Sequence, residues 1–182
     1  MTIPFIDLQA QRLRLGGKIE AAVQEAVVGG AWVMGPQVRQ FEADLAAFGQ
    51  AKHALGCANG TEALVLPLMA WGIGEGDAVF VPSFTFTATA EIVPWVGATP
   101  VFVDVDPDTY NMDPVKLAAA IEGIKAEGRL TPRVVIAVDI FGQPADYPAI
   151  KKVVDAHGLK LISDSAQGFG CTIEGKHPLD WA

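Results

Sequence analysis

From position 53 onward, the sequence alternates between short apolar runs and longer segments of helical character. The runs are HALGCA at 53–58, AVFVP at 78–82, PVFVDV at 100–105, VVIAV at 134–138 and LKLIS at 159–163. The segments between them, at 60–72, 86–97, 114–127 and 146–157, are each long enough for one helix. Strands joined by such helices pair in parallel. The pattern therefore predicts an α/β fold, a mostly parallel sheet with helices on both faces and with ligands at the carboxyl ends of the strands.

The first 50 residues follow a different pattern. Apolar residues recur at helical spacing in 14–28 and in 37–48, and Gly29-Gly30 and Gly35-Pro36 interrupt the chain between them. We therefore expect two opening helices ahead of the sheet. The 182 residues are enough for one domain with a sizeable core and too few for two full-sized domains.

Composition narrows the class of protein. Apolar residues make up 51% of the chain and charged residues 19%, which excludes a disordered protein. A net charge of -8 argues against nucleic acid as the main partner, because binding to a phosphate backbone needs a concentrated positive face. No apolar run is long enough for a membrane helix, and the N-terminus lacks the pattern of a secretory signal. We expect a cytoplasmic protein.

The chain has only two cysteines, Cys57 and Cys171, which also favours a cytoplasmic protein. So few cysteines fit a reducing compartment. Neither has a second cysteine or a histidine at metal-ligand spacing, so we predict no metal site and expect both to be buried small residues.

The first candidate ligand site runs from Cys57 to Leu64, where the first predicted strand, at about 54–57, turns through Gly60 into a helix. N–H groups at a helix start lack intrahelical acceptors and carry partial positive charge, so they can hold a phosphate. The same turn is also compatible with an ordinary helix cap by Asn59 or Thr61. It indicates a phosphate site only in combination with other features.

Two further candidate sites follow later strands. Phe86, in the stretch PSFTFT at 82–87, can cover the face of a flat heterocycle, whereas the alternative is that Phe84 and Phe86 pack against the following helix. Asp164 ends the last predicted strand, where a carboxylate that faces a pyridine nitrogen would favour the protonated ring. Its alternative role is to cap the turn that follows.

A phosphate turn, an aromatic ring and an acid at the ends of successive strands form a set that can hold a phosphorylated pyridine cofactor. The motifs NGTEAL, PSFTFTATA, GATPVFVDVDPDTY, FGQPADY and DSAQ, in this order, resemble those of the DegT/StrS-type sugar aminotransferases. FIDL at 5–8 and GPQV at 35–38 are similar to the opening segment of that family. The resemblance covers essentially the whole chain and implies the fold-type I pyridoxal-phosphate architecture.

The resemblance also implies roles for individual residues. Gly60 and Thr61 would contact the phosphate of pyridoxal 5'-phosphate, and Phe86 would stack on its pyridine ring. Asp164 would pair with the ring nitrogen and is the predicted catalytic residue. Gln167 would lie against the ring near its phenolic oxygen. The implied activity is transfer of an amino group from a donor such as glutamate to a nucleotide-linked keto-sugar, by a homodimer.

The resemblance further implies how much of the family this chain contains. We expect residues 1–182 to be the N-terminal segment and part of the pyridoxal-phosphate-binding large domain. In the family, the lysine that binds the cofactor follows the segment that matches Glu174 to Lys176. We therefore expect this lysine and the C-terminal small domain beyond Ala182, so that the chain alone is inactive. The strand at 54–57 would lack its main-chain partner, and Lys176 would be a solvated turn residue.

Some alternatives stay open on the sequence. One is a pyridoxal-phosphate-dependent sugar dehydratase of the same family, in which histidine replaces the lysine, and another is a non-catalytic fragment that binds the cofactor or a nucleotide-sugar. A dinucleotide-binding oxidoreductase fits less well, because no G-x-G-x-x-G follows the first predicted strand. Asp139 follows a strand and is a candidate for a supporting role, whereas Asp104 and Asp106 belong to a DVDPD turn.

Overall fold

The structure is a computed structural model that describes residue 3 and residues 5–182. The chain divides into two compact units, Met1–Gly56 and Cys57–Ala182. None of the helices in the part of the chain that the structure describes is long and apolar enough to cross a membrane.

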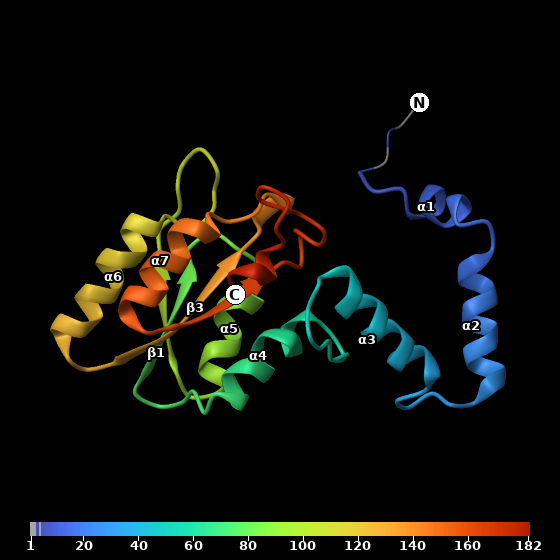
Figure 1. The fold of residues 1–182 in the computed structure, drawn as a ribbon, viewed down its shortest axis with the longest axis horizontal. Helices are drawn as coiled ribbons and strands as arrows, with labels where there is room; N and C mark the ends of the chain where they lie inside the picture. The colour runs from blue at the N-terminus through green and yellow to red at the C-terminus, as the bar shows by residue number, and fades with distance from the viewer. Residues whose placement is uncertain (1–2, 4) are drawn as a thin grey trace. The chain divides into compact units, whose positions relative to one another are not determined.

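The first unit consists of helices and connecting turns (Figure 1). Its helices are α1 (Leu8–Arg14), α2 (Lys18–Gly29) and α3 (Pro36–Phe48). The expected helix at 37–48 is confirmed, with Pro36 in the first turn, where its missing N–H costs nothing. The expected helix at 14–28 begins later, at Lys18, because Gly16 and Gly17 adopt positive φ values of 57° and 81° that end α1 and break the pattern.

The second unit is a four-stranded parallel sheet with the order β2-β1-β3-β4. Its strands are β1 (Asp77–Pro82), β2 (Thr99–Val103), β3 (Thr131–Val138) and β4 (Lys160–Asp164). Helices α5 (Ala88–Trp95), α6 (Pro114–Glu127) and α7 (Tyr147–His157) connect successive strands, and α4 (Gly60–Ala70) precedes β1. The predicted parallel sheet and its crossover helices are confirmed.

Side chains that alternate along each strand build two cores. On one face, Phe80 and Val135 pack with residues of α6 and α7. On the other face, Val79 and Ile136 pack with residues of α4 and α5. The sheet is therefore covered on both sides, which explains why its strands read as continuous apolar runs rather than as alternating ones.

The order of the strands creates a topological switch point between β1 and β3. The crossover after β1 lies on the α4 and α5 face, and the crossover after β3 lies on the α6 and α7 face. β1 and β3 are neighbours, so the chain leaves their carboxyl ends in opposite directions. A crevice forms at such a switch point, and ligands of open α/β sheets bind there.

One predicted element is wrong. Residues 54–57 form no strand and take part in none of the ladders of the sheet. A strand needs a hydrogen-bonded neighbour, and the described residues provide none for this segment. Residues 54–56 belong to the first unit, whereas the strands at 78–82 and 159–163 belong to the second, so the expected lack of pairing between them stays a prediction.

Candidate cofactor site

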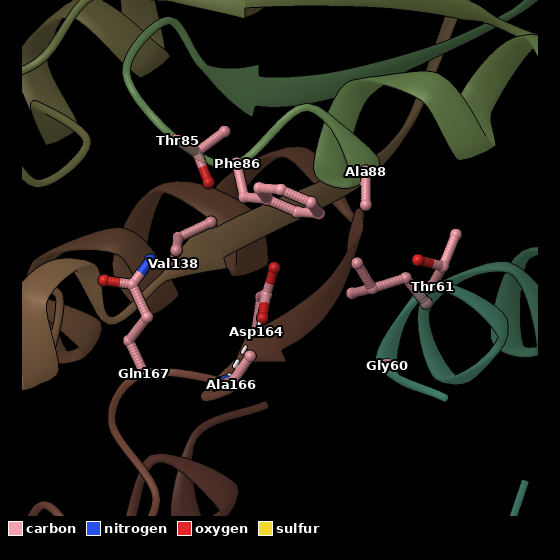
Figure 2. A pocket seen from close by; sticks show the side chains of 10 residues that line it. Gly60, Thr61, Thr85, Phe86, Ala88, Val138, Asp164, Ala166 and Gln167 are labelled. Carbon is pink, nitrogen blue, oxygen red and sulfur yellow. Dashed lines mark hydrogen bonds between the residues drawn. The ribbon is translucent and has the colours of Figure 1, made fainter. Parts of the chain in front are cut away.

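A cavity of about 370 Å³ opens at the carboxyl edge of the sheet, at the switch point. It is lined by Gly60, Thr61, Leu64, Thr85, Phe86, Ala88, Val138, Asp164, Ala166 and Gln167. Every residue that the sequence predicted for the cofactor site is among them, although they come from segments more than 100 positions apart (Figure 2). The volume lies within the usual range for small-molecule sites.

Gly60 and Thr61 form the first turn of α4 on one side of this cavity. The helix is capped by Asn59, whose side-chain oxygen accepts a hydrogen bond of 2.9 Å from the N–H of Glu62. The cap predicted as the alternative role of this turn is therefore present. This cap accepts the N–H of Glu62. It does not engage the N–H groups of Gly60 and Thr61, which lie in the first turn and have no intrahelical acceptors. A Cβ added at Gly60 would meet no atom within 4 Å, so the approach to this turn is open.

The two phenylalanines after β1 have different surroundings. Phe86 lines the cavity and keeps 69% of its surface exposed, with its ring above Asp164 in Figure 2. Phe84 instead contacts Tyr110 and Phe141, with ring centroids 5.5 and 6.0 Å apart. Neither ring is buried in the core, so the alternative of simple packing against α5 does not describe Phe86.

Asp164 ends β4 and directs its carboxylate into the cavity (Figure 2). Oδ2 accepts a hydrogen bond of 3.0 Å from the hydroxyl of Thr89, and Oδ1 accepts one of 3.2 Å from the N–H of Ala166. The second bond is the turn cap that the sequence left open. Thr89 is fully buried in α5 and also lies 3.1 Å from the hydroxyl of Thr85. The carboxylate is thus held in position by a helix and by the turn that follows β4.

Gln167 lies in the turn that follows Asp164. Its Oε1 accepts a hydrogen bond of 2.8 Å from the N–H of Phe141, which fixes the amide near the end of β3. With the oxygen engaged in this way, the NH₂ group is the end of the side chain that can donate to a ligand.

Sequence reasoning missed the residues that hold the site in place. Thr85 and Thr89 stand four positions apart, a spacing that places side chains on one side of a helical turn. Ser163 and Ser165 flank Asp164 and belong to a buried network around Asp139 and Tyr147. The motif SDS contains a signal for that network, because successive residues of a strand face opposite sides of the sheet and the two serines therefore face the same side.

Other polar residues behave largely as the sequence indicated. The Asp106 carboxylate accepts the N–H groups of Asp108 and Thr109, and these bonds lower its pKa. Lys116 and the N–H of Val105 lower the pKa of Asp104. Both acids are structural, as predicted.

Lys176 lies in an exposed turn closed by the bridge between Ile173 and Lys176, as predicted. The expectation for the cysteines is wrong in part: Cys57 is exposed, and Cys171 is only partly buried. Cys57 is the last residue of the segment 54–57, which forms no strand. No cluster of metal-ligating side chains occurs among the described residues.

A parallel sheet whose switch-point cavity combines a helix start, an exposed aromatic ring and a fixed carboxylate is an α/β domain with a candidate ligand site. The chain belongs to the DegT/DnrJ/EryC1/StrS aminotransferase family, whose model matches residues 14–178. The family resemblance drawn from the motifs is confirmed.

Individual relatives agree with this assignment. The chain is 46% identical over 176 residues to the UDP-2-acetamido-2-deoxy-3-oxo-D-glucuronate aminotransferase of Pseudomonas aeruginosa, covering 96% of the chain and 46% of that relative. A DegT DnrJ EryC1 StrS aminotransferase from Brucella abortus superposes with a TM-score of 0.91 at 51% identity, over 93% of the chain and 45% of the other. NtdA from Bacillus subtilis, solved with bound cofactor PMP, has a TM-score of 0.79 at 28% identity, over 94% and 38%. The chain therefore spans about half the length of the relatives it matches.

Proposed function

We propose that this chain is the cofactor-binding part of a pyridoxal-phosphate-dependent aminotransferase that moves an amino group from an amino acid such as glutamate to a nucleotide-linked keto-sugar. The observation that carries the proposal is the single cavity at the switch point, around which Gly60, Phe86 and Asp164 meet. The Pseudomonas relative, named for a UDP-linked 3-oxo sugar, supports this substrate class. The complete protein is proposed to be a cytoplasmic homodimer, as the resemblance implies.

The residues present fit pyridoxal 5'-phosphate in kind. The start of α4 offers N–H groups and partial positive charge for a phosphate, which suits a chain whose net charge is -8 and whose anion sites must be local. Phe86 offers an exposed apolar face for a flat ring. Asp164 is the charged residue of the cavity lining, and its negative charge suits a protonated ring nitrogen.

When bound, the cofactor supplies an electron sink that allows an amino group to pass between substrates. The part of the chain is to place and tune the ring. Asp164 would hold a proton at the ring nitrogen, and hydrogen bonds from Thr89 and from the N–H of Ala166 keep its carboxylate in position. Phe86 excludes water from one ring face, while Gln167 is proposed to donate from Nε2 to the phenolic oxygen.

The proposal is tested on the complete gene product that contains this chain. Purified protein is incubated with glutamate and a UDP-linked 3-keto hexose, and mass spectrometry measures the amino sugar formed with and without added pyridoxal 5'-phosphate. We expect cofactor-dependent product. Failure to bind the cofactor, or elimination of water from the sugar without nitrogen gain, would refute the proposal.

The first prediction concerns the acid of this site. Asp164→Asn in the complete protein is expected to lower the rate of amino transfer by about 100-fold, because an opposite charge shifts the pKa of a neighbouring group by about 1–3 units and asparagine removes that charge. Steady-state rates measure the effect, and circular dichroism checks the fold. Near-native activity in a folded variant would show that Asp164 does not pair with the ring.

A further inference from the structure

Asp139 is an acid that the proposed mechanism does not use, and it is fully buried at the end of β3. A buried carboxylate is tolerated only when its oxygens are hydrogen-bonded. Here Oδ1 accepts from the N–H of Ala145 at 3.0 Å and from the hydroxyl of Tyr147 at 2.8 Å. Oδ2 accepts from the hydroxyl of Ser165 at 2.5 Å and lies 3.6 Å from the thiol of Cys171. Asp139 therefore joins three segments of the chain.

These bonds continue into a closed ring of side chains. The hydroxyl oxygen of Ser163 lies 2.6 Å from that of Tyr147 and 2.8 Å from that of Ser165. Asp139, Tyr147, Ser163 and Ser165 thus form a cycle of four contacts. The ring lies on the side of the sheet where Tyr147 begins α7.

The ring holds both chain neighbours of Asp164. Successive residues at a strand end face opposite sides of the sheet. Ser163 and Ser165 turn toward Tyr147 of α7, whereas Asp164 turns toward Thr89 of α5 and into the cavity. Fixing the two serines on one face therefore fixes the Asp164 carboxylate on the other.

The backbone around Asp139 also contacts other residues of the turn at 164–168. The N–H of Asp139 donates to the carbonyl of Asp164 at 3.0 Å, and the N–H of Phe141 donates to Gln167 at 2.8 Å. Gly168 packs so closely that a Cβ built on it would lie 2.4 Å from the Cβ of Asp139. One short segment thus contacts the turn at the positions of Asp164, Ser165, Gln167 and Gly168.

We propose that Asp139 is a positioning residue for the cofactor site: through Ser165 and the hydroxyl ring it sets the conformation of residues 164–168 before any cofactor binds. Asp164 and Gln167 then present the ring-binding groups without further ordering. The inference rests on the proposed function for its consequence, which is tighter cofactor binding. The ordering of the turn itself can be measured without the cofactor.

The ring offers a variant that separates position from charge. In Asp139→Asn, Oδ1 still accepts from Ala145 and Tyr147, and the NH₂ group donates to Ser165, whose hydrogen then passes to Ser163. One hydrogen of the asparagine NH₂ group joins the three hydroxyl hydrogens of the ring, so each of its four contacts can carry one. Asp139→Leu keeps a similar volume but removes every hydrogen bond of the Asp139 side chain. Ser165→Ala removes only the contacts of Ser165 with Asp139 and Ser163.

Two measurements are made on the 182-residue chain. Hydrogen exchange of the amides of residues 164–168 is followed without cofactor, and the Kd for pyridoxal 5'-phosphate is measured by equilibrium dialysis. We expect Ser165→Ala and Asp139→Leu to speed exchange and to raise the Kd by about tenfold, since a hydrogen bond to a charged group is lost. Asp139→Asn should stay within about twofold of the parent chain in both measurements, because its ring remains closed.

Asp77→Asn is the matched control. Asp77 is also a buried acid, but it pairs with Arg133 at the amino end of β1, away from the cavity. The Asp77→Asn variant should leave unchanged both the hydrogen exchange of residues 164–168 and the Kd for pyridoxal 5'-phosphate. A loss that is equal in this variant would show a general effect of removing buried charge and would overturn the proposal.

The remaining outcomes are also decisive. If Asp139→Leu does not fold, Ser165→Ala and Asp139→Asn still decide. A folded Ser165→Ala chain with parent exchange rates overturns the positioning role, and so does an Asp139→Asn chain that behaves as Ser165→Ala does. If the parent chain does not bind pyridoxal 5'-phosphate, the proposed function fails, while the exchange rates of the variants still test the ordering of the turn.

Discussion

Phe84 and Phe86 lie two positions apart in the same loop but have different neighbours, and this makes them a matched pair for experiment. Phe86 faces the cavity, whereas Phe84 contacts Tyr110 and Phe141. We expect Phe86→Ala to weaken binding of pyridoxal 5'-phosphate by roughly 1–3 kcal/mol, through lost apolar contact and stacking. Phe84→Ala should change the Kd little. Titration of both variants with the cofactor measures this, and equal losses would contradict the assignment of Phe86.

Cys171 provides a pH-dependent prediction. Burial and, next, the charge of Asp139 raise the pKa of its thiol to about 11. The folded chain therefore holds this proton more tightly than an unfolded chain, whose cysteine has a pKa of about 8.5. At pH 8 the thiolate fraction is small, and its higher intrinsic nucleophilicity offsets only part of the loss.

We therefore expect iodoacetamide to modify Cys171 about tenfold more slowly than an ordinary thiol at pH 8, with the rate rising up to pH 11. Peptide mass spectrometry over time measures both cysteines in one sample. Exposed Cys57 is the internal control for reagent access. A Cys171 rate that matches Cys57 and levels off near pH 8.5 would show that the site does not raise this pKa.

At the residue scale, the sequence located the groups that face the cavity but not the groups that hold them. Phe86 and Asp164 were identified because a strand ends close to each of them, and Gly60 was identified because a helix begins there. Thr89 and Tyr147 lie in helices and contact residues at the end of β4. The hydrogen bond from Thr89 to Asp164 joins residues 75 positions apart, so it depends on packing that a local sequence pattern does not contain.

At the scale of elements, the core between the sheet and helices α4 and α5 leads to a prediction about stability. Ile136 of β3 is fully buried in the core beneath α4 and α5. Ile136→Ala is expected to lower the free energy of unfolding by about 2–5 kcal/mol, because it removes buried methylenes and leaves a cavity. Urea denaturation followed by circular dichroism measures the change. Val115→Ala, at a position that is 78% exposed, is the control and should stay within about 0.5 kcal/mol.

Strand and helix prediction succeeded or failed for a physical reason. β1, β3 and β4 were predicted closely because both of their faces are covered, so apolar runs mark them from end to end. The segment at 54–57 has a similar apolar composition but no partner, and composition alone does not provide the hydrogen bonds of a ladder. The first expected helix is interrupted at Gly16 and Gly17, because their positive φ values are incompatible with a continuous helix despite the helical spacing of the apolar residues.

At the scale of the whole molecule, cofactor attachment can be predicted from what lines the cavity. No lysine is among its lining residues, and Lys176 lies in an exposed turn. A polypeptide of these 182 residues is therefore expected to bind pyridoxal 5'-phosphate without a covalent bond. Borohydride treatment of the soaked and purified polypeptide, followed by peptide mass spectrometry, should show no phosphopyridoxyl lysine. A stable adduct at Lys176 would contradict this.

The contact between Gly168 and Asp139 has a consequence for how sequences of this kind can diverge. No positive φ requires glycine at 168, so what excludes a side chain there is the side chain of Asp139, whose Cβ would lie 2.4 Å from an added Cβ. The two positions should therefore covary over evolution: a lineage that gains a side chain at 168 has to give up bulk at 139, and with it the anchor of Ser165. Such a double change passes through an intermediate with either a steric clash or a loosened turn. The substitutions that this proposed cofactor site tolerates are thus restricted by two residues that need not contact the cofactor.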